Sequence, residues 1–583
     1  METLSSNDND FKSLKLSDEV PEFMTLEGFQ TLSRGYLLPG ETPRGMYRRL
    51  SHTAATILSR PELEDQFFNA FWGNWICPSS PVCSNFGSTR GLPISCFSST
   101  IPDSVDGIFK TVHETAMLSK HGGGMGHYWG EVRGRGVEIK GNGESEGIIP
   151  WLKIEDTVIS SVSQGGVRRG SSAQYLDVTH PDIDEFIDVR RQTGDESRRC
   201  RSVGFHHAVV FDDAFMQRVE DGDEDSRRIW SKFLKTRWEM GEPYAMFGDN
   251  ANNGAPDIYK DKGLRITTSN LCNEIYLYTD DEHTFVCCLS SMNLARYDEW
   301  KDTNAVQLAI WFLDAIMSDF ISQARAIDGF ERAVRFAEAS RALGLGALGW
   351  HTLLQSKMIP FESFDAMQLN NEIWKHIQSE ATTATKDLAL AYGEPEWCKG
   401  YGVRNTHLTA VAPTLSNSII SGGVSEGIQP NIANVYANKT AKGTFLRRNP
   451  LLGALLESKG HNDDDTWRKI NADRGSVKRL SFLTEEEKAV FLTAREINQF
   501  AIVRQAAQRQ RYIDQGQSLN LFFSTPPEDA DAETRNLIAR YFHDVHMEAW
   551  KTGLKGLYYC RTESPLKGDA VFREESDCLA CEA

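Results

Sequence analysis

Three side chains capable of chemistry stand at alternate positions of one short segment. The run Ser269-Asn-Leu-Cys-Asn-Glu-Ile275 contains Asn270, Cys272 and Glu274. In an extended strand or loop, alternate side chains share a face, so we expect an amide, a thiol and a carboxylate to project together. Such a group makes a poor core surface and suits a reactive site, but a polar edge strand with an incidental cysteine fits the same window. The segment alone leaves both interpretations open.

Cys96 and Cys287 lie in a different setting. Each belongs to a short apolar run, Gly-Leu-Pro-Ile-Ser-Cys96-Phe or Phe-Val-Cys287-Cys-Leu, that is typical of a buried strand. A lone buried cysteine most often acts as a small hydrophobic side chain. Zinc binding is a weak alternative, because only Cys578 and Cys581 have the tight spacing of metal ligands and no histidine pair completes a site.

The pattern along the rest of the chain predicts an α/β fold that would position these residues. Apolar residues recur at helical spacing through 51–75 and 304–325, and short apolar runs alternate with glycine-rich turns through 91–211. Helix-like and strand-like runs then alternate to about residue 560. We therefore expect a disordered lead (1–22), a helical region (23–90), a catalytic domain (91–561) and a mobile tail (562–583).

Composition limits the partners and the compartment. The net charge of −18 argues against non-specific binding to nucleic acid, which needs a basic face. It still allows a local basic pocket for a phosphorylated small molecule. No secretory signal is recognisable, and apolar stretches such as 342–354 are too short to span a bilayer. We expect a cytoplasmic protein without a membrane or nucleic-acid partner, whose 11 cysteines act as thiols or redox groups.

The three cysteine windows, taken in order, resemble the active-site cysteines of ribonucleotide reductase large subunits. The resemblance extends from about Leu32 across nearly the whole chain. It implies a class I enzyme whose fold is a ten-stranded α/β barrel of two parallel five-stranded halves, with a helical region in front and Cys272 on a finger loop inside. The motifs that carry it are Tyr36-Leu-Leu-Pro-Gly-Glu-Thr42, Gly165-Gly-Val-Arg-Arg-Gly170, Tyr175-Leu-Asp-Val-Thr-His-Pro-Asp-Ile183, Gly241-Glu-Pro-Tyr244, Ala412-Pro-Thr-Leu-Ser416, Tyr512-Ile-Asp-Gln-Gly-Gln-Ser-Leu-Asn520 and Leu557-Tyr-Tyr559.

The resemblance assigns the steps of ribose reduction to individual residues. Cys272 would become a thiyl radical that takes the 3′-hydrogen, because its S–H bond is close in strength to an activated ribose C–H bond. Glu274 would act as general base on the 3′-hydroxyl, and Asn270 would hold the substrate hydroxyls. Cys96 would protonate the departing 2′-hydroxyl. Cys96 and Cys287 would then supply two electrons and close into a disulfide, which requires Cα atoms within about 4.4–6.8 Å.

The other cysteines near the site and in the tail raise separate questions. Cys288 follows Cys287, and since successive strand side chains face opposite ways, only one of the two can face Cys96. The register of the following Leu-Ser favours Cys287. By resemblance, the CxxC formed by Cys578 and Cys581 reduces the active-site disulfide and is recharged by a thioredoxin or glutaredoxin.

Hydroxyl and amide side chains are expected at the substrate phosphates. The segment 413–418 is predicted to be a loop entering a helix N-terminus, where hydroxyls and free N–H groups suit a diphosphate, although an ordinary helix cap is the commoner interpretation. Resemblance to the substrate-binding segments of the family favours a binding role, with ribonucleoside diphosphates as substrates. The matching residues are Ser80, Ser95, Ser416, Asn417 and Ser418.

Tyr558 and Tyr559 would by default be strand aromatics. By resemblance they relay the radical from a separate small subunit that carries the metal-radical cofactor, and no metal is expected in this chain. The pair distinguishes class I from the adenosylcobalamin-dependent class. That class and a catalytically inactive nucleotide-binding subunit stay as alternatives.

Regulation is implied by the same resemblance. Asp103, Arg133, Gln164 and Arg168 match an effector site for a deoxynucleoside triphosphate or ATP and the loop that links it to substrate choice, although the arginine-rich loop also fits a solvated turn. The polar lead is too short for the family's N-terminal ATP-binding cone, so we expect no overall activity control through that domain. A homodimer is expected.

Overall fold

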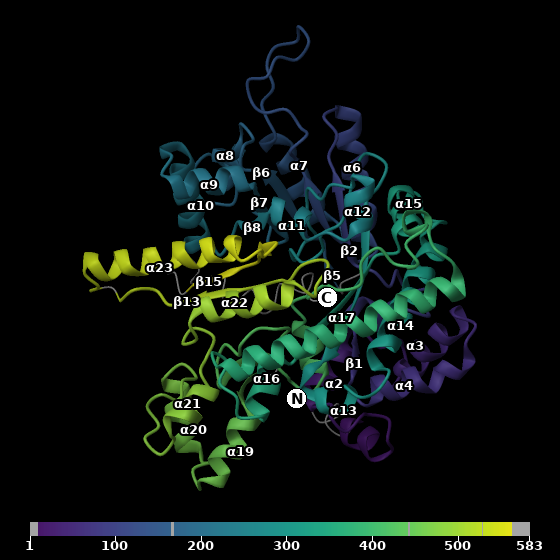
Figure 1. Cartoon of the computed structure of the whole chain (residues 1–583), viewed down its shortest axis with the longest axis vertical. Helices are drawn as coiled ribbons and strands as arrows, with labels where there is room; N and C mark the ends of the chain where they lie inside the picture. Colours follow the sequence, from purple (N-terminus) through teal and green to yellow (C-terminus); the bar gives the residue numbers. More distant parts are fainter. Residues whose placement is uncertain (1–9, 165–167, 441–442, 528, 563–583) are drawn as a thin grey trace.

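The computed structural model describes residues 10–562, except for 165–167, 441–442 and 528. Strands lie at the centre of the molecule and helices surround them (Figure 1). Cys578 and Cys581, which the sequence places on a redox tail, lie outside the described residues.

Helices form the N-terminal region, as the sequence predicts. They are α2 (Leu26–Gly35), α3 (Pro43–Ile57) and α4 (Glu64–Trp72). The hydroxyls of Thr25 and Thr42 cap α2 and α3, each accepting a hydrogen bond of 3.1 Å from a backbone N–H of the first turn. The predicted helical stretch 51–75 is interrupted, because Pro61 begins a short 3₁₀ turn, η1 (Pro61–Leu63), between α3 and α4.

Residues 10–22 differ from the expected disordered lead. Residues 10–16 are helical, and Val20 is buried. The ring of Phe11 packs on Phe29 of α2, with the ring centroids 5.5 Å apart. A few apolar side chains thus anchor this segment, although its composition is polar.

Five parallel strands form one half of the central sheet. Their order is β2 (Cys96–Thr100), β3 (Gly124–Tyr128), β6 (Ser172–Asp177), β7 (Phe205–Phe211) and β8 (Tyr244–Phe247). Every neighbouring pair in this series is parallel. This is the arrangement expected for one half of the barrel, and nearly all of its strand residues are buried, as in sheets covered on both faces.

The other half begins at β9 (Phe285–Asn293), which pairs antiparallel with β2 and parallel with β10 (Leu343–Leu348). β1 (Ile76–Pro78) pairs antiparallel with β9. Beyond β10 the ladder continues only as isolated parallel bridges, Leu345 with Thr409 and Val411 with Gln517. The expected second set of five regular parallel strands is therefore only partly present among the described residues.

The backbone of β10 lies very close to the loop around residue 410, which allows strand pairing to continue beyond β10. A Cβ atom at Gly346 would lie 2.5 Å from the carbonyl oxygen of Ala410, so only glycine allows this neighbour to come so near. Backbone hydrogen bonds then connect the segments, from Leu345 N–H to Leu408 and from Val411 N–H to Gly516. The loops around residues 410 and 516 thus close this side of the barrel.

Helix α14 (Ala305–Ala324) is the helix predicted over 304–325. It is long and apolar enough to cross a membrane by length and composition, but 72% of its most apolar window is buried inside the fold. It packs against α17 (Phe364–Tyr392) and β9. Its apolar surface therefore belongs to the core.

The remaining helices surround the sheet or form a smaller lobe with its own hydrophobic cluster around Leu452 and Trp467 (Figure 1). The longer ones are α6 (Val105–Lys120), α7 (Ile149–Ser161), α9 (Asp213–Asp221), α10 (Glu224–Met240), α15 (Glu331–Ser340), α19 (Pro450–Ser458), α20 (Asp464–Ala472), α22 (Gln499–Gln510) and α23 (Ala532–Lys551). The shorter ones are α5 (Ser80–Asn85), α8 (Ile183–Ile187), α11 (Gly248–Asn253), α12 (Asp257–Lys262), α13 (Tyr297–Trp300), α16 (Trp350–Ser356), α18 (Leu415–Ile420) and α21 (Glu485–Val490). Short strands are β4 (Ser163–Gln164), β5 (Arg168–Arg169), β11 (Val435–Thr440), β12 (Gly443–Arg448), β13 (Leu521–Phe523), β14 (Gly556–Leu557) and β15 (Cys560–Thr562).

Candidate functional site

Cys96 and Cys287 face each other where the two halves of the sheet meet. They are directly opposed residues of the antiparallel pair β2–β9. Opposed residues of such a pair have Cα atoms about 4.5–5.5 Å apart, which lies within the range of a disulfide. Both side chains are buried, and no disulfide joins the two sulfurs. Strand register therefore brings together two cysteines from distant parts of the sequence in a geometry that allows a disulfide to form.

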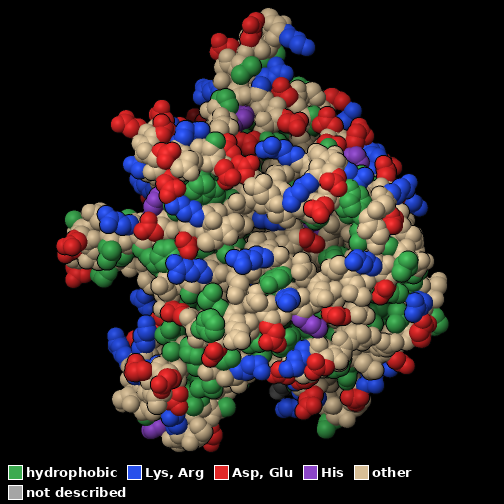
Figure 2. Space-filling model, viewed as in Figure 1, with side chains coloured by type: hydrophobic (Ala, Val, Ile, Leu, Met, Phe, Trp, Pro, Cys, Tyr) green, Lys and Arg blue, Asp and Glu red, His purple; other side chains and the backbone are tan. Residues whose placement is uncertain are grey.

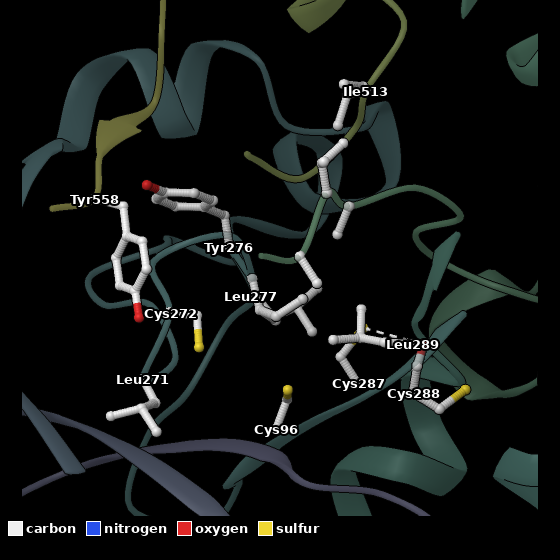
Figure 3. Packing of buried hydrophobic residues seen from close by; sticks show 14 of the residues in the cluster. Cys96, Leu271, Cys272, Tyr276, Leu277, Cys287, Cys288, Leu289, Ile513 and Tyr558 are labelled. Atoms are coloured by element: carbon white, nitrogen blue, oxygen red, sulfur yellow. Dashed lines mark hydrogen bonds between the residues drawn. The ribbon is translucent and has the colours of Figure 1, made fainter. Parts of the chain in front are cut away.

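Cys288 points to the other side of β9. Its thiol lies 3.3 Å from the carbonyl oxygen of Leu313 on α14. Figure 3 shows its sulfur directed away from Cys96. Gln515 instead donates a hydrogen bond of 3.5 Å to the sulfur of Cys287. The structure thus distinguishes the two adjacent thiols by the faces of one strand.

Cys272 lies on the loop between α12 and β9, in the same buried cluster as Cys96 and Cys287 (Figure 3). The loop passes close to the parallel strands. A Cβ at Gly126 of β3 would lie 1.9 Å from the carbonyl oxygen of Ser269, so glycine is required there. Cys272 is only 3% exposed, so its thiol is shielded from solvent.

The segment around Cys272 is a tight turn and not the extended strand considered from the sequence. Asn273 has a φ of 60°, and its N–H donates to the carbonyl oxygen of Asn270 at 3.3 Å. The Asn270 side-chain oxygen accepts hydrogen bonds from the N–H groups of Glu274 and Ile275, at 3.1 and 3.2 Å. Asparagine favours such turns because its side chain replaces a backbone partner. Alternation along a strand is therefore not what gathers these side chains.

Asn270 and Glu274 are nevertheless in contact across the turn. The amide nitrogen of Asn270 donates to Oε1 of Glu274 at 3.0 Å, and the Ser518 hydroxyl lies 2.9 Å from Oε2. Burial raises the pKa of Glu274 to about 7, although the hydrogen bonds from Asn270 and Ser518 lower it. A carboxylate with that pKa is able both to accept and to return a proton near neutral pH.

Residues expected at the substrate phosphates come together at the starts of two short helices. Ser80 begins α5, and Ser416, Asn417 and Ser418 lie in the first turn of α18, as the predicted loop-to-helix transition requires. The Ser80 hydroxyl donates to the side-chain oxygen of Asn417 at 3.4 Å. Ser95 precedes β2, and its hydroxyl lies 4.0 Å from the sulfur of Cys96. The side chains of Ser80, Ser416, Asn417 and Ser418 are all buried.

Tyr558 and Tyr559 form a ring pair just after β14. Their ring centroids are 4.3 Å apart. Tyr558 is 1% exposed and belongs to the cluster around Cys272, whereas Tyr559 is half-buried. Tyr244 on β8 contacts both, with centroid distances of 4.8 and 5.1 Å. Nothing in the motif Gly241-Glu-Pro-Tyr244 marks Tyr244 as a neighbour of this pair.

The residues matched to an effector site lie at the two opposite ends of the parallel strands. Asp103 and Arg133 follow the C-terminal ends of β2 and β3, whereas the hairpin with Gln164 and Arg168 precedes the N-terminal end of β6. Nε of Arg133 lies 2.8 Å from Oδ2 of Asp103, and both side chains are about one-third exposed. Gln164 and Arg168 are opposed residues of the short hairpin β4–β5, which follows α7 directly. Residues 165–167 between them lie outside the described residues.

A groove of about 1060 Å³ lies between α10 and α23. Its apolar lining includes Trp230, Trp238, Phe542 and Met547, and charged side chains border it. Figure 2 shows α23 standing out from the body of the molecule. The Thr562 hydroxyl donates to the carbonyl oxygen of Trp238 at 2.7 Å, so the groove adjoins the chain segment that carries the tyrosine pair.

Comparisons with known proteins identify the family to which the chain is similar. Residues 22–91 match the ribonucleotide reductase all-alpha domain, and 94–226, 223–400 and 395–560 match its barrel domain. The chain is 40% identical over 545 residues to the putative ribonucleoside-diphosphate reductase large subunit of Frog virus 3 (isolate Goorha), covering 90% of this chain and 93% of that one. It is 34% identical over 639 residues to the ribonucleoside-diphosphate reductase large subunit of Invertebrate iridescent virus 3, covering 95% and 98%.

A solved structure is also similar. The class Id ribonucleotide reductase alpha subunit of Actinobacillus ureae shares 41% identity with a TM-score of 0.84, covering 94% of this chain and 99% of that one. The family models together span the helical region and the barrel. This chain therefore belongs to the ribonucleotide reductase large-subunit family.

Proposed function

We propose that the chain is the catalytic subunit of a class I ribonucleoside-diphosphate reductase that acts through a radical on Cys272. The observation that carries this proposal is the direct opposition of Cys96 and Cys287 in the cluster that also contains Cys272. A dithiol able to form a disulfide beside a buried third thiol is what reduction of a ribose 2′-hydroxyl needs. The names of the relatives and of the solved alpha subunit support the same activity.

The first steps are hydrogen abstraction and proton transfer. A thiyl radical on Cys272 takes the 3′-hydrogen of the ribose and becomes a thiol. Glu274 accepts the 3′-hydroxyl proton, for which its pKa of about 7 is suited. Asn270 holds Glu274 in place and offers its amide to the substrate hydroxyls.

The later steps use the opposed pair. Cys96 protonates the 2′-hydroxyl, which leaves as water. Cys96 and Cys287 together give two electrons and two protons and become a disulfide, while Cys272 returns a hydrogen atom to C3′ and recovers its radical. One ribonucleotide and two thiols thus yield one deoxyribonucleotide, one water and one disulfide.

Substrate phosphates would bind where α5 and α18 begin. Ser80, Ser416, Asn417 and Ser418 provide hydroxyl and amide donors in one buried region, and Ser95 lies beside Cys96. Donors of this kind suit a diphosphate. This placement supports binding of the ribose between the phosphate region and the cysteines.

The radical would come from a separate small subunit that holds the metal-radical cofactor. Tyr558 and Tyr559 connect the cluster around Cys272 with a half-buried position near the surface. The apolar groove between α10 and α23 adjoins this position and fits an extended or helical segment of that small subunit. We therefore place the docking site for the small subunit at this groove.

Regeneration and regulation involve further partners. Cys578 and Cys581 would reduce the active-site disulfide and then exchange with a thioredoxin or glutaredoxin. Asp103, Arg133 and the β4–β5 hairpin with Gln164 and Arg168 would bind a deoxynucleoside triphosphate or ATP effector. We expect a homodimer, in keeping with the family.

Turnover with purified components tests this function. The chain alone, given cytidine diphosphate, an effector and dithiothreitol, should be inactive, and adding a cognate small subunit should yield deoxycytidine diphosphate. Turnover by the isolated chain with bound corrinoid would support the adenosylcobalamin-dependent alternative. The small subunit used should be one that activates a related large subunit. If this chain then binds nucleotides but gives no turnover, the alternative of a catalytically inactive nucleotide-binding subunit is supported.

A further inference from the structure

The side chain of Asn273 joins the Cys272 turn to the segment that carries the tyrosine pair. Its amide nitrogen donates one hydrogen bond of 3.2 Å to the carbonyl oxygen of Leu557 and one of 3.1 Å to that of Ala245. Leu557 and Ala245 are directly opposed residues of the antiparallel pair β8–β14. One amide group thus binds both strands of this pair, and β14 leads directly into Tyr558.

The oxygen of the same amide is held as well. It accepts a hydrogen bond of 3.2 Å from the hydroxyl of Tyr276. The Tyr276 side chain lies between two glycines, because a Cβ at Gly556 would be 2.2 Å from its hydroxyl and a Cβ at Gly516 would be 2.2 Å from its ring. Asn273 and Tyr276 are both 0% exposed. The amide is therefore fixed at both ends and shielded from competition by water.

Asparagine suits this position for two reasons. The φ of Asn273 is 60°, in the left-handed region, which asparagine, aspartate and glycine adopt more readily than other residues. An amide also combines two N–H donors with an acceptor oxygen on a short side chain. Aspartate and glycine allow the same backbone conformation without the two donors, so they separate the shape of the turn from its bonds to β8 and β14.

Hydrogen-atom transfer between Tyr558 and Cys272 depends on their separation. In the relay proposed above, a radical on Tyr558 takes the hydrogen atom of the Cys272 thiol, so that a phenol O–H bond forms and the S–H bond breaks. Reacting atoms need to approach to about 3–3.5 Å, and a displacement of about 1 Å costs about 100-fold in rate. Figure 3 shows the hydroxyl of Tyr558 pointing toward Cys272. The two residues lie on segments far apart in the sequence, so a bond between these segments controls their separation.

We propose that Asn273 is a positioning residue for radical transfer, which sets the separation of Cys272 from Tyr558 through its hydrogen bonds to Leu557 and Ala245. This inference rests on the radical relay in the proposed function. Loss of the two bonds should slow the step that moves the radical onto Cys272. Delivery of the radical to Tyr558 and binding of the substrate should not change, because neither depends on these bonds.

Two substitutions test the proposal. Asn273→Gly removes every side-chain bond and should lower turnover about 100-fold in the presence of the small subunit. Asn273→Asp keeps the acceptor for Tyr276 but offers at most one proton to the two carbonyl groups, so it should also lower turnover; it carries the test if the glycine variant does not fold. The KM for cytidine diphosphate and the rising limb of the pH–rate profile, which Glu274 sets, should stay unchanged. Asn462→Gly, at an exposed asparagine of the smaller lobe, is the matched control and should keep full turnover.

A radical trap at position 558 locates the affected step. Replacing Tyr558 with 3-aminotyrosine, which is oxidised more easily than tyrosine, retains the radical at that position, where electron paramagnetic resonance detects it. With the small subunit, effector and cytidine diphosphate present, this radical should form at the same rate and yield whether residue 273 is Asn, Asp or Gly. Equal radical formation together with lower turnover of the chains that retain Tyr558 is the expected result.

The outcomes separate this inference from the relay itself. If no aminotyrosyl radical forms in the chain that retains Asn273, the relay is wrong and the inference falls with it. If the radical forms but Asn273→Asp or Asn273→Gly keeps full turnover, the relay stands and Asn273 does not position it. Slower radical formation in the variants, a raised KM or a shifted pH–rate profile would show a general disturbance of the turn and would also overturn the proposal.

Discussion

The reducing cysteines and the radical cysteine are positioned by two different kinds of structure. Cys96 and Cys287 stand on regular strands, so backbone register alone fixes their opposition. Cys272 stands on a turn whose shape depends on single side chains, among them Asn270 and Ser518. The reducing pair should therefore tolerate changes in its neighbours, whereas the radical site should be sensitive to each hydrogen bond around it.

Loss of the radical thiol should have the largest effect. Cys272→Ser should lower turnover at least about 1000-fold, which corresponds to about 4 kcal/mol of activation free energy, because an alcohol O–H bond is too strong for serine to form the needed radical. The thermal midpoint should change little, since the substitution is nearly isosteric. Steady-state formation of deoxycytidine diphosphate, measured with dithiothreitol, checks the rate. Activity within tenfold of the unmodified chain would remove Cys272 from the mechanism.

The tail cysteines should affect only re-reduction. Changing both Cys578 and Cys581 to serine should abolish turnover supported by thioredoxin and leave most of the rate with dithiothreitol, because a small dithiol enters the barrel and a folded reductant does not. Parallel assays with the two reductants measure this. Full thioredoxin-supported activity in the double variant would contradict the role of the tail and favour zinc binding or a purely structural role.

Substitution of Glu274 should have the next largest effect on turnover. Glu274→Gln should lower turnover about 100-fold or more, because the amide cannot accept a proton. For the unmodified chain, the rate should rise as the pH increases through about 7, since burial raises the pKa of Glu274 to about 7 and the base must be ionised. A pH–rate profile of both enzymes is the measurement. A profile of the unmodified chain that is flat between pH 6 and 8 would show that another group accepts the proton.

Substitution of Ser518 should have a smaller effect, and it tests whether single hydrogen bonds around Cys272 control the site. Its hydroxyl lies 2.9 Å from the Glu274 carboxylate and lowers the pKa of that group. Ser518→Ala should therefore move the rising limb of the pH–rate profile about one pH unit higher, which corresponds to a hydrogen bond of about 1.4 kcal/mol. The rate at high pH should be nearly retained. A uniform loss at every pH would indicate damage to the turn and not a change in the base.

The sequence was informative where a local pattern determines the outcome. The helix expected over 304–325 is α14, and the loop-to-helix transition at 413–418 is the start of α18. The shape of the Cys272 turn could not be read from alternation, because Asn273 adopts a left-handed conformation that reverses the chain. The contact between His206 and Tyr559 could not be predicted either, since the two residues are 353 positions apart in the sequence.

The two halves of the barrel show the same limit. The parallel half is regular. The half beyond β10 is built from isolated bridges and from a close backbone approach at Gly346, and no periodic sequence pattern predicts these features. Cys96 and Cys287 are likewise nearly 200 positions apart in the sequence, and only the resemblance to a family suggested their opposition beforehand.

Mapping the disulfide formed in a single turnover tests the central claim most directly. The fully reduced chain, with Cys578 and Cys581 changed to serine, is mixed with the small subunit, effector and cytidine diphosphate without a reductant. Peptide mass spectrometry should then find one Cys96–Cys287 disulfide for each deoxycytidine diphosphate formed. Cys288→Ser should give the same yield, because Cys288 faces Leu313 on the opposite side of β9, whereas Cys287→Ser should give none. Product formed without this disulfide, or a disulfide that uses Cys288, would contradict the account.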